Sequence, residues 1–501
     1  MLRNVGSNWV LTVLTVLVSY LLTPFVVHSL GREGYGTWTL VNAMTGYLGL
    51  VTLGVPMACM RFVAQHVSLK EWTKANQTIG TCAGLYLMLG GAALVIGGGL
   101  WVAFLFYDIP ASYRADAYLA FGMMVLYVGL SFFSLLPEGI MFAHHDFVPR
   151  NLVRISGVLL RLGLTFALLR YRPSLSSLAA IQLIGLAFDF FTSLTIIRLR
   201  YTNLRIDLRL FDWATLRRVL SFSLFVLLMA AGARLSFETD ALVIGSMLGV
   251  AFIPAYSFAN SLVVYLVEFI VGIAAVVSPM ATALSSQSRD EELQRMYLKW
   301  SKAALSITIA AGLFLIVLGP RFIGWWIGPE YEEPSGSVLL PLMLSCFVFL
   351  PARGVAVPIL MGLGKARIPT ITFLVAGVAN LVMSALLARP YGLFGVAIGT
   401  AIPNAIFGLI VIAETCRELN LSMFSYGRYV LPRATVGALP MLALLVWFKA
   451  ALGVSTFAGL ATAGAAMVIV FGFIWVLFVY RDDPYVDVWS PIVRFRGWSR
   501  A

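Results

Sequence analysis

Apolar runs of membrane-spanning length recur along the whole chain, from Asn8 to Tyr480. Because each helical residue advances the chain by about 1.5 Å, a helix needs about 20 apolar residues to cross the hydrocarbon core of a bilayer. The stretches between the runs are too short to fold as soluble domains. The sequence therefore predicts an all-α, polytopic membrane protein.

On this length criterion, the chain contains about 14 membrane-spanning runs. With 60% hydrophobic residues, 12% charged residues and a mean hydropathy of +0.90, a soluble globule would lack a polar surface. We expect the first run to remain as a transmembrane helix, because it is longer than the apolar region of a signal peptide. The predicted spans are 6–30, 34–61, 79–106, 117–143, 150–170, 175–197, 220–247, 252–284, 300–320, 337–362, 368–388, 391–413, 429–449 and 456–480.

The distribution of basic residues predicts the orientation of the chain. Its formal net charge is +12, and most Arg and Lys residues lie at the N-terminus, in alternate loops and in the C-terminal tail. This asymmetry is the positive-inside pattern and predicts that both termini lie in the cytoplasm. We therefore assign the basic residues to the membrane surface and expect no nucleic-acid partner.

The chain also repeats itself once. A shift of 218 residues places Leu30-Gly31 on Leu248-Gly249 and Trp38 on Tyr256. Two lobes of six helices would then be related by a pseudo-two-fold axis along the membrane normal. A coincidence of small residues in a Gly-rich apolar chain is the alternative. The predicted divisions are an N-terminal lobe (1–202), a linker (203–218), a C-terminal lobe (219–416), and helices 13 and 14 with a cytoplasmic tail (417–501).

Basic and apolar residues alternate in the linker, Asn203–Arg218. This pattern has two interpretations. One is an interfacial helix whose arginines contact anionic lipid, and the other is an ordinary basic loop.

Three segments carry a family resemblance. Leu30–Trp38 resembles the turn that opens the second helix of bacterial polysaccharide export proteins, and Asp240–Tyr256 and Asn380–Thr400 agree with the same family. These are the Wzx-like oligosaccharide flippases of the multidrug/oligosaccharidyl-lipid/polysaccharide exporter superfamily. The C-terminal helix pair resembles that of the fourteen-helix members, in which it helps to form a lipid-facing groove.

The resemblance implies a flippase of the bacterial cytoplasmic (inner) membrane. Such a protein moves polyprenyl-diphosphate-linked oligosaccharide to the outer leaflet by alternating access, for exopolysaccharide, capsule or O-antigen synthesis. The implied partners are that substrate and membrane lipids, with a polysaccharide polymerase and a co-polymerase as further candidates. No cofactor is implied.

Ionisable residues near the middle of predicted spans are the candidates for contact with the substrate headgroup, because a charge in lipid costs a few kcal/mol unless it faces a cavity or a partner. An arginine binds diphosphate well, since its planar guanidinium is permanently charged and donates in pairs. Arg154 and Arg161 lie seven residues apart, which predicts a basic stripe on one helix face. The full candidate set is Arg161, Arg234, Arg61, Arg353, Asp189 and Glu268.

Structural roles are open for several of these residues. Arg161 could form an ion pair with Asp189, and Arg234 could pair with Glu238 four residues later. Arg61 lies near a helix end, where snorkelling to the interface explains it equally well.

Two further groups complete the predicted site. Glu238, Asp240 and Asn380 are candidates for a site that binds a coupling cation or proton, although Asp240 could instead cap a helix. The repeated turns are predicted to act as gates, and their residues are Gly31, Tyr35, Gly36, Gly249 and Tyr256.

Other functional classes are less consistent with the sequence. The four cysteines lie far apart and predict no metal site, and Gly362-Leu363-Gly364-Lys365 lacks the spacing of an ATP-binding loop. The longest outward loop, 321–336, is too short for the catalytic site of a glycosyltransferase or polymerase, so we expect no enzyme. Ion-coupled efflux of cationic drugs or small molecules and a non-transporting scaffold remain as alternatives.

Overall fold

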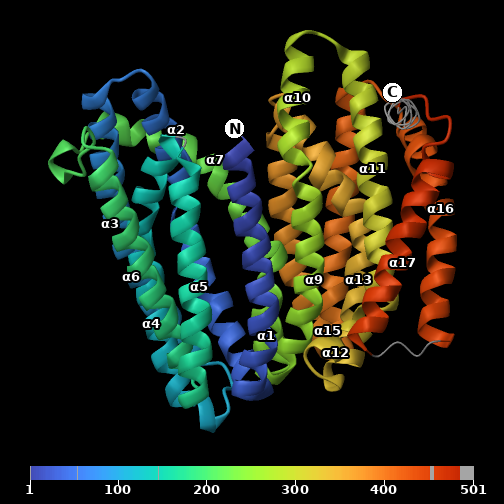
Figure 1. The fold of residues 1–501 in the computed structure, drawn as a ribbon, viewed down its shortest axis with the longest axis horizontal. Coiled ribbons are helices and arrows are strands. Elements are labelled where there is room, and N and C mark those ends of the chain that lie inside the picture. Colours follow the sequence, from blue (N-terminus) through green and yellow to red (C-terminus); the bar gives the residue numbers. More distant parts are fainter. Residues whose placement is uncertain (1, 53–54, 145, 452–455, 486–501) are drawn as a thin grey trace, which may run out of the picture. The chain divides into compact units, whose positions relative to one another are not determined.

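The computed structural model describes residues 2–52, 55–144, 146–451 and 456–485, and this part of the chain contains helices, turns and loops but no strand (Figure 1). The prediction of an all-α fold is confirmed. The elements are α1 (Leu2–Gly46), η1 (Tyr47–Thr52), α2 (Val55–Ser68), α3 (Trp72–Phe104), α4 (Ala111–Ala143), α5 (Phe147–Tyr171), α6 (Leu175–Arg200), η2 (Leu208–Leu210), α7 (Trp213–Phe237), α8 (Thr239–Met247), η3 (Val250–Phe252), α9 (Ile253–Val271), α10 (Ala274–Ser286), α11 (Asp290–Val317), α12 (Gly319–Trp326), η4 (Pro329–Tyr331), α13 (Glu332–Pro351), η5 (Ala352–Ala356), α14 (Val357–Gly362), α15 (Arg367–Glu418), α16 (Met423–Ala451), α17 (Phe457–Ile474) and η6 (Trp475–Val479).

The chain divides into two compact units. Unit 1 contains residues 1–234 and 244–254, and unit 2 contains residues 235–243 and 255–501. Unit 1 therefore takes in the predicted linker and most of α7. The division into six-helix lobes at 202 and 219 stays a prediction.

Two kinks at glycine explain most of the difference between the long helical segments of the structure and the 14 predicted spans. Among the described residues, eleven helical segments are long and apolar enough to cross a membrane. Two of them contain helices that meet at a non-helical glycine, Gly31 (φ 70°) in α1 and Gly392 (φ 59°) in α15. A straight helix of the length of α15, 52 residues, would extend about 78 Å, more than twice a hydrocarbon core of about 30 Å. Counting both halves of each kinked segment and adding α7 with α8 accounts for the 14 predicted spans.

The two halves of α15 pack tightly against each other. A Cβ atom on Gly395 would lie 2.1 Å from the carbonyl oxygen of Leu387, and one on Gly399 would lie 2.4 Å from the Ser384 hydroxyl oxygen. These contacts join residues on either side of Gly392 at increasing separation, as in an antiparallel hairpin. Only glycine allows the two halves to approach this closely.

The two repeated turns share one backbone feature, a glycine with positive φ: Gly31 at 70° and Gly249 at 103°. Within unit 1, the turns pack directly against each other. A Cβ atom on Gly36 would lie 2.0 Å from the carbonyl oxygen of Val250, so glycine is required there. The Arg32 Nε donates a hydrogen bond to the carbonyl oxygen of Ala251 at 2.6 Å.

The predicted linker, Asn203–Arg218, is helical only at its end, because residues 213–218 form the first turns of α7 and residues 203–212 contain no α-helix. Residues 201–212, which we call the strap, contain only the single 3₁₀ turn η2, and α7 begins at Trp213. The strap lies on α3, because the Asn76 side chain accepts a hydrogen bond from the Arg205 amide and the Thr81 hydroxyl accepts one from the Asp212 amide. A Cβ atom on Gly80 would lie 2.4 Å from the Asp207 carbonyl oxygen. Side chains of α3 thus accept hydrogen bonds from two backbone amides of the strap without a helix.

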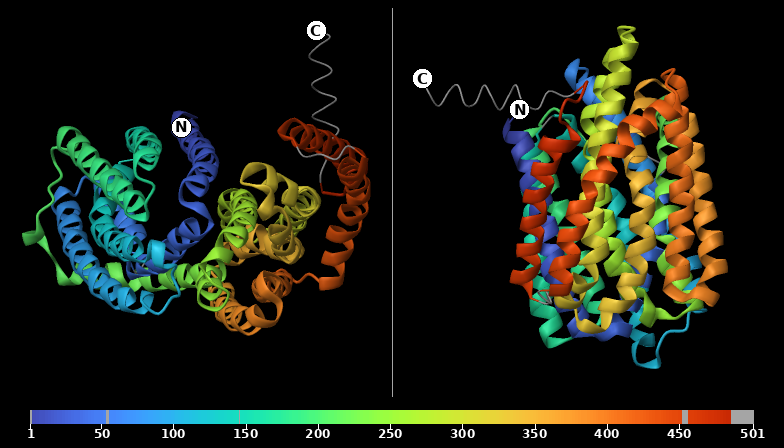
Figure 2. Two further views of the ribbon diagram at one scale, coloured as in Figure 1. Left: turned by 90° about the horizontal axis from the view of Figure 1, so that it is seen from below. Right: turned by 90° about the vertical axis from the view of Figure 1, so that its right-hand side faces the viewer.

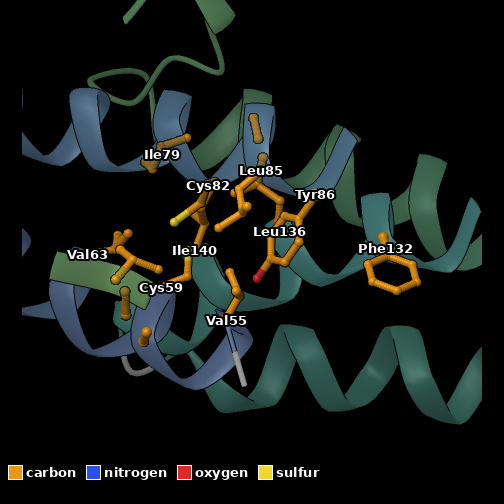
Figure 3. Packing of buried hydrophobic residues seen from close by; sticks show 14 of the residues in the cluster. Val55, Cys59, Val63, Ile79, Cys82, Leu85, Tyr86, Phe132, Leu136 and Ile140 are labelled. Atoms are coloured by element: carbon orange, nitrogen blue, oxygen red, sulfur yellow. The ribbon is translucent and has the colours of Figure 1, made fainter. Parts of the chain in front are cut away.

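The core of unit 1 is formed in part by α2, α3 and α4, whose apolar side chains interdigitate in Figure 3. Cys59 and Cys82 lie in this cluster and are 1% and 0% exposed. All four cysteines are buried thiols outside any disulfide. They act as small apolar residues, as predicted.

The C-terminal helices α16 and α17 run side by side and pack against α11 and α12 within unit 2 (Figure 2). A buried ion pair joins the chain after η6 to α11, with the Lys302 Nζ 2.5 Å from an Asp483 carboxylate oxygen. The Tyr429 hydroxyl donates to the same carboxylate at 2.8 Å. The Lys302 ammonium also lies 4.7 Å and 4.8 Å from the ring centres of Tyr429 and Tyr480. No sequence motif pointed to this cluster, whose members lie far apart along the chain.

We expect Asp483→Asn to lower the apparent melting temperature of the purified full-length protein, because it leaves the Lys302 ammonium buried without its counter-charge. Breaking a buried pair of this kind costs about 3–5 kcal/mol. The double variant Lys302→Met/Asp483→Leu should be more stable than Asp483→Asn. As a control, Arg289→Gln removes an exposed pair with Glu292 and should change stability by less than about 1 kcal/mol. Equal melting temperatures for wild type and Asp483→Asn would contradict this account of the cluster.

Candidate functional site

Arg161 and Asp189 form an ion pair between α5 and α6. The Arg161 Nη2 donates to the Asp189 Oδ2 at 2.7 Å, and the two side chains are 21% and 25% exposed. Two glycines make room for the pair. A Cβ atom on Gly157 would lie 2.1 Å from Asp189 Oδ1, and one on Gly185 would lie 2.4 Å from Arg161 Nε. Of the two roles left open for Arg161, the structure therefore contains the ion pair with Asp189.

The second carboxylate oxygen of Asp189 takes no part in the ion pair with Arg161. Asp189 Oδ1 is buried and has no hydrogen-bond partner within the described part of the chain. A buried acceptor without a donor is costly, so this oxygen weakens the stability of the packing between α5 and α6.

The predicted basic stripe of α5 is partly neutralised by α4. Glu138 accepts a hydrogen bond from Arg154 at 2.8 Å and lies 3.7 Å from Arg150. With Arg161 and Asp189, these residues comprise three arginines and two carboxylates. The stripe therefore keeps one net positive charge. Glu138 was not among the residues predicted from the sequence, because its carboxylate comes from a different helix.

Arg234 lies near the 3₁₀ helix η1 in unit 1. A Cβ atom on Gly49 would lie 3.5 Å from the Arg234 Nη2, and the Tyr47 hydroxyl donates to the Arg234 carbonyl oxygen at 3.4 Å. The interruption of regular helix at η1 thus lies beside a candidate headgroup residue. Pairing of Arg234 with Glu238 stays a prediction.

Asp240, at the start of α8, is the centre of a buried polar network in unit 2. Its carboxylate accepts hydrogen bonds from the Tyr256 hydroxyl at 2.6 Å and the Thr400 hydroxyl at 3.0 Å. Asn380 accepts from Ser384 at 2.8 Å and from Thr400 at 3.2 Å, and its amide nitrogen donates to the Ser236 carbonyl oxygen. These buried groups satisfy one another, since each side chain of the network has at least one partner.

This network contains residues from two of the segments that carry the family resemblance. Asp240 and Tyr256 come from one segment, and Asn380 and Thr400 come from the other. The predicted coupling residues Asp240 and Asn380 therefore meet through Thr400. Ser384 was missed, although it lies one helical turn after Asn380 on the same face.

Arg353 lies in the π-helical segment η5, where the hydrogen-bonding pattern of the helix changes. Its guanidinium lies 4.7 Å from the ring centre of Phe373. No described residue forms a hydrogen bond or ion pair with the Arg353 side chain. Irregular π-turns inside helices occur frequently at functional sites. An arginine without a protein carboxylate can accept an anionic ligand.

The remaining candidates are more exposed. Glu268 lies on an exposed face of α9, and among the described residues its carboxylate has no partner. Because a carboxylate in hydrocarbon is costly, this face suits a hydrated path. Arg61 of α2 is exposed and lies 5.8 Å from the Phe62 ring centre, and Tyr35 of α1 is half-buried. The roles of these residues stay predictions.

Two curated proteins are similar to this chain over most of its length. EpsK of Bacillus subtilis, named as an uncharacterized membrane protein, is 23% identical over 89% of this chain and 87% of its own length. A Shigella flexneri protein whose name assigns it to O-antigen transport is 22% identical over 75% of this chain and 88% of its own length.

Two solved structures share the fold. The lipid II flippase MurJ in an inward closed conformation has a TM-score of 0.67 and 12% identity, over 96% of this chain and 99% of MurJ. A multidrug resistance transporter of the MATE family in an inward-facing conformation also has a TM-score of 0.67, with 17% identity over 80% of this chain and 94% of its own. At these identities, the likeness concerns the fold alone.

Residues 1–285, more than half of the chain, match the model of one protein family, whose description is "Polysaccharide biosynthesis protein". The chain therefore belongs to the polysaccharide biosynthesis protein family.

Proposed function

We propose that this chain is a flippase that moves polyprenyl-diphosphate-linked oligosaccharide from the cytoplasmic to the outer leaflet of the bacterial inner membrane. The family match carries the proposal. The Shigella flexneri relative and the fold shared with the lipid II flippase support it. The protein acts as a transporter, and both termini lie in the cytoplasm. A polysaccharide polymerase and a co-polymerase are the proposed partners that use its product.

The charged groups inside the helices suit the headgroup of this substrate. A diphosphate needs donors that stay charged in a medium of low dielectric, and guanidinium groups meet this need. Arg353 lacks a carboxylate partner among the described residues, and the stripe on α5 keeps one net positive charge. Each unit thus contains its own candidate cation for the diphosphate, Arg353 in unit 2 and the stripe on α5 in unit 1.

Transport proceeds by alternating access in this proposal, with the headgroup site open first to the cytoplasm and then to the outside. The packed turns at Gly31 and Gly249 are the proposed gate, and the contact between Arg32 and Ala251 would break when the site opens outward. The polyprenyl chain stays in the lipid throughout, because its transfer into water would be strongly unfavourable.

The Asp240 network is the proposed coupling site. It presents oxygen atoms from a carboxylate, three hydroxyl groups and an amide, which are the ligand types that bind a proton or a hard cation. Binding of a proton or cation at Asp240 neutralises the carboxylate and changes which hydrogen bonds it accepts. The bound ion can therefore alter the packing of α8 against α9 and α15. Glu238, two residues before Asp240, would lie on the path of the ion.

Efflux of cationic drugs or small molecules is the second candidate, because MATE-family transporters share the fold. The two functions differ in what accumulates when the protein is lost.

Depletion of the chain from its host should cause the lipid-linked oligosaccharide to accumulate on the cytoplasmic leaflet and should halt polymer export. The sidedness can be measured with a membrane-impermeant probe of the glycan, applied to intact and lysed spheroplasts. Re-expression of the wild-type chain serves as the control. An unchanged leaflet distribution, together with new sensitivity to cationic drugs, would favour efflux.

Arg353→Gln should reduce the rate of headgroup translocation by about 10–100-fold, because a hydrogen bond to a charged group is worth about 1.5–3 kcal/mol. Arg353→Lys should retain an intermediate rate, since it keeps the charge but loses paired donation. Rates would be measured in proteoliposomes at matched protein content. As a matched control, Arg170→Gln removes a charge from the last turn of α5 and should have little effect. A wild-type rate for Arg353→Gln would exclude Arg353 from the headgroup site.

Asp240→Asn should uncouple transport from an imposed proton or sodium gradient, since the amide keeps the size of the carboxylate but loses its charge. The gradient dependence of translocation in proteoliposomes is the measurement. Tyr256→Phe removes one donor but keeps the carboxylate, so it should shift the dependence without abolishing it. If Asp240→Asn responds to both gradients as the wild type does, Asp240 is not the coupling residue.

A further inference from the structure

Unit 1 contains an apolar pocket that none of the proposed steps uses. Its volume is about 290 Å³, and it is lined by residues of α3, α4, α6 and the strap. Tyr86 and Leu136 form part of its wall and lie close together in Figure 3. Small-molecule sites typically measure about 300–1,000 Å³, so this pocket fits a segment of one hydrocarbon chain better than a whole lipid.

The strap shapes the pocket. Ile206 and Leu208 belong to its lining, although they are 42% and 51% exposed. The hydrogen bonds of the strap to Asn76 and Thr81 place these two apolar side chains beside α6. The strap therefore acts as one wall of the pocket and does not cover it completely.

Arg198 is the one charged residue among those that line the pocket. It lies in the last turn of α6, is exposed, and forms no hydrogen bond or ion pair with any residue that the structure describes. Phe190 lines the pocket eight residues earlier on the same helix, about 12 Å along the helix axis. The site is thus polar and positive at one end and apolar at the other.

This polarity matches a membrane lipid at the cytoplasmic interface. The positive-inside pattern predicts that the end of α6 and the strap face the cytoplasm, where anionic lipids attract basic residues. Arg205 and Arg209 of the strap are also exposed and add positive charge on this side. The apolar walls lie within the membrane span of α6, where a lipid chain is the neighbouring medium.

We propose that this pocket is a binding site for an anionic phospholipid of the cytoplasmic leaflet. The phosphate contacts the Arg198 guanidinium, and a segment of one acyl chain occupies the space beside Tyr86, Leu136 and Phe190. A lipid bound here contacts α6 and the strap together, and so stabilises the segment that connects the two repeats. The inference does not depend on the identity of the transported substrate.

Native mass spectrometry of the purified full-length protein tests this proposal. The protein, delipidated in detergent, would be titrated separately with phosphatidylglycerol, phosphatidylcholine and undecaprenyl phosphate. We expect tighter binding of phosphatidylglycerol than of phosphatidylcholine. Arg198→Gln should weaken phosphatidylglycerol binding about fivefold, as expected for the loss of one basic residue at a membrane surface. Arg200→Gln is the matched control, because Arg200 lies on the same helix but outside the pocket and near Asp146.

Filling the pocket provides an independent variant. Leu194→Trp should reduce retention of both phospholipids while the melting temperature in detergent stays near that of wild type. If this variant does not fold, Leu87→Trp at the pocket wall is the substitute. Equal binding of the two phospholipids, or an Arg198→Gln profile equal to that of Arg200→Gln, would overturn the proposal. Preferred binding of undecaprenyl phosphate would also overturn it and assign the pocket to the substrate chain.

Discussion

The absence of water inside a bilayer is the constraint on which the rest of this structure depends. Backbone hydrogen bonds must be satisfied within the chain, so each crossing segment is helical and the described residues contain no strand. The same constraint applies to charged side chains. Arg161 is paired with Asp189, Lys302 is paired with Asp483, and the Asp240 carboxylate accepts hydroxyl hydrogen bonds. Arg353 and Glu268 are candidate functional residues for which the described part of the chain supplies no counter-charge.

Glycine residues make many of these close contacts between helices and turns possible. Gly157 and Gly185 leave the space that the ion pair between α5 and α6 occupies, and Gly36 allows the two repeated turns to touch. In a membrane, where lipid tails are as apolar as leucine, helices associate through close packing, and small residues permit it. The proposed gate and the proposed headgroup site therefore share one structural basis.

Several features could be predicted from local sequence. Apolar length indicated the crossing segments, because hydrophobic thickness is a property of the bilayer and not of the fold. The repeat pointed to Gly31 and Gly249, and both have positive φ. The strap shows the limit of this reasoning. Its alternating basic and apolar residues permitted an interfacial helix, but partners on α3, including Asn76 and Gly80, stabilise an irregular segment instead.

Hydropathy and motif spacing are local properties, so the residues alone were enough to predict a polytopic, all-helical membrane protein that resembles a known export family. The neutralisation of one charged residue by another became visible only in the folded chain. Glu138 meets Arg154 across two helices, and Thr400 joins Asp240 to Asn380 from a position far along the chain. Pairings of this kind depend on how each helix is rotated, and how deep it lies, relative to its neighbours. Packing between helices sets both quantities, so the sequence of a single helix does not encode them.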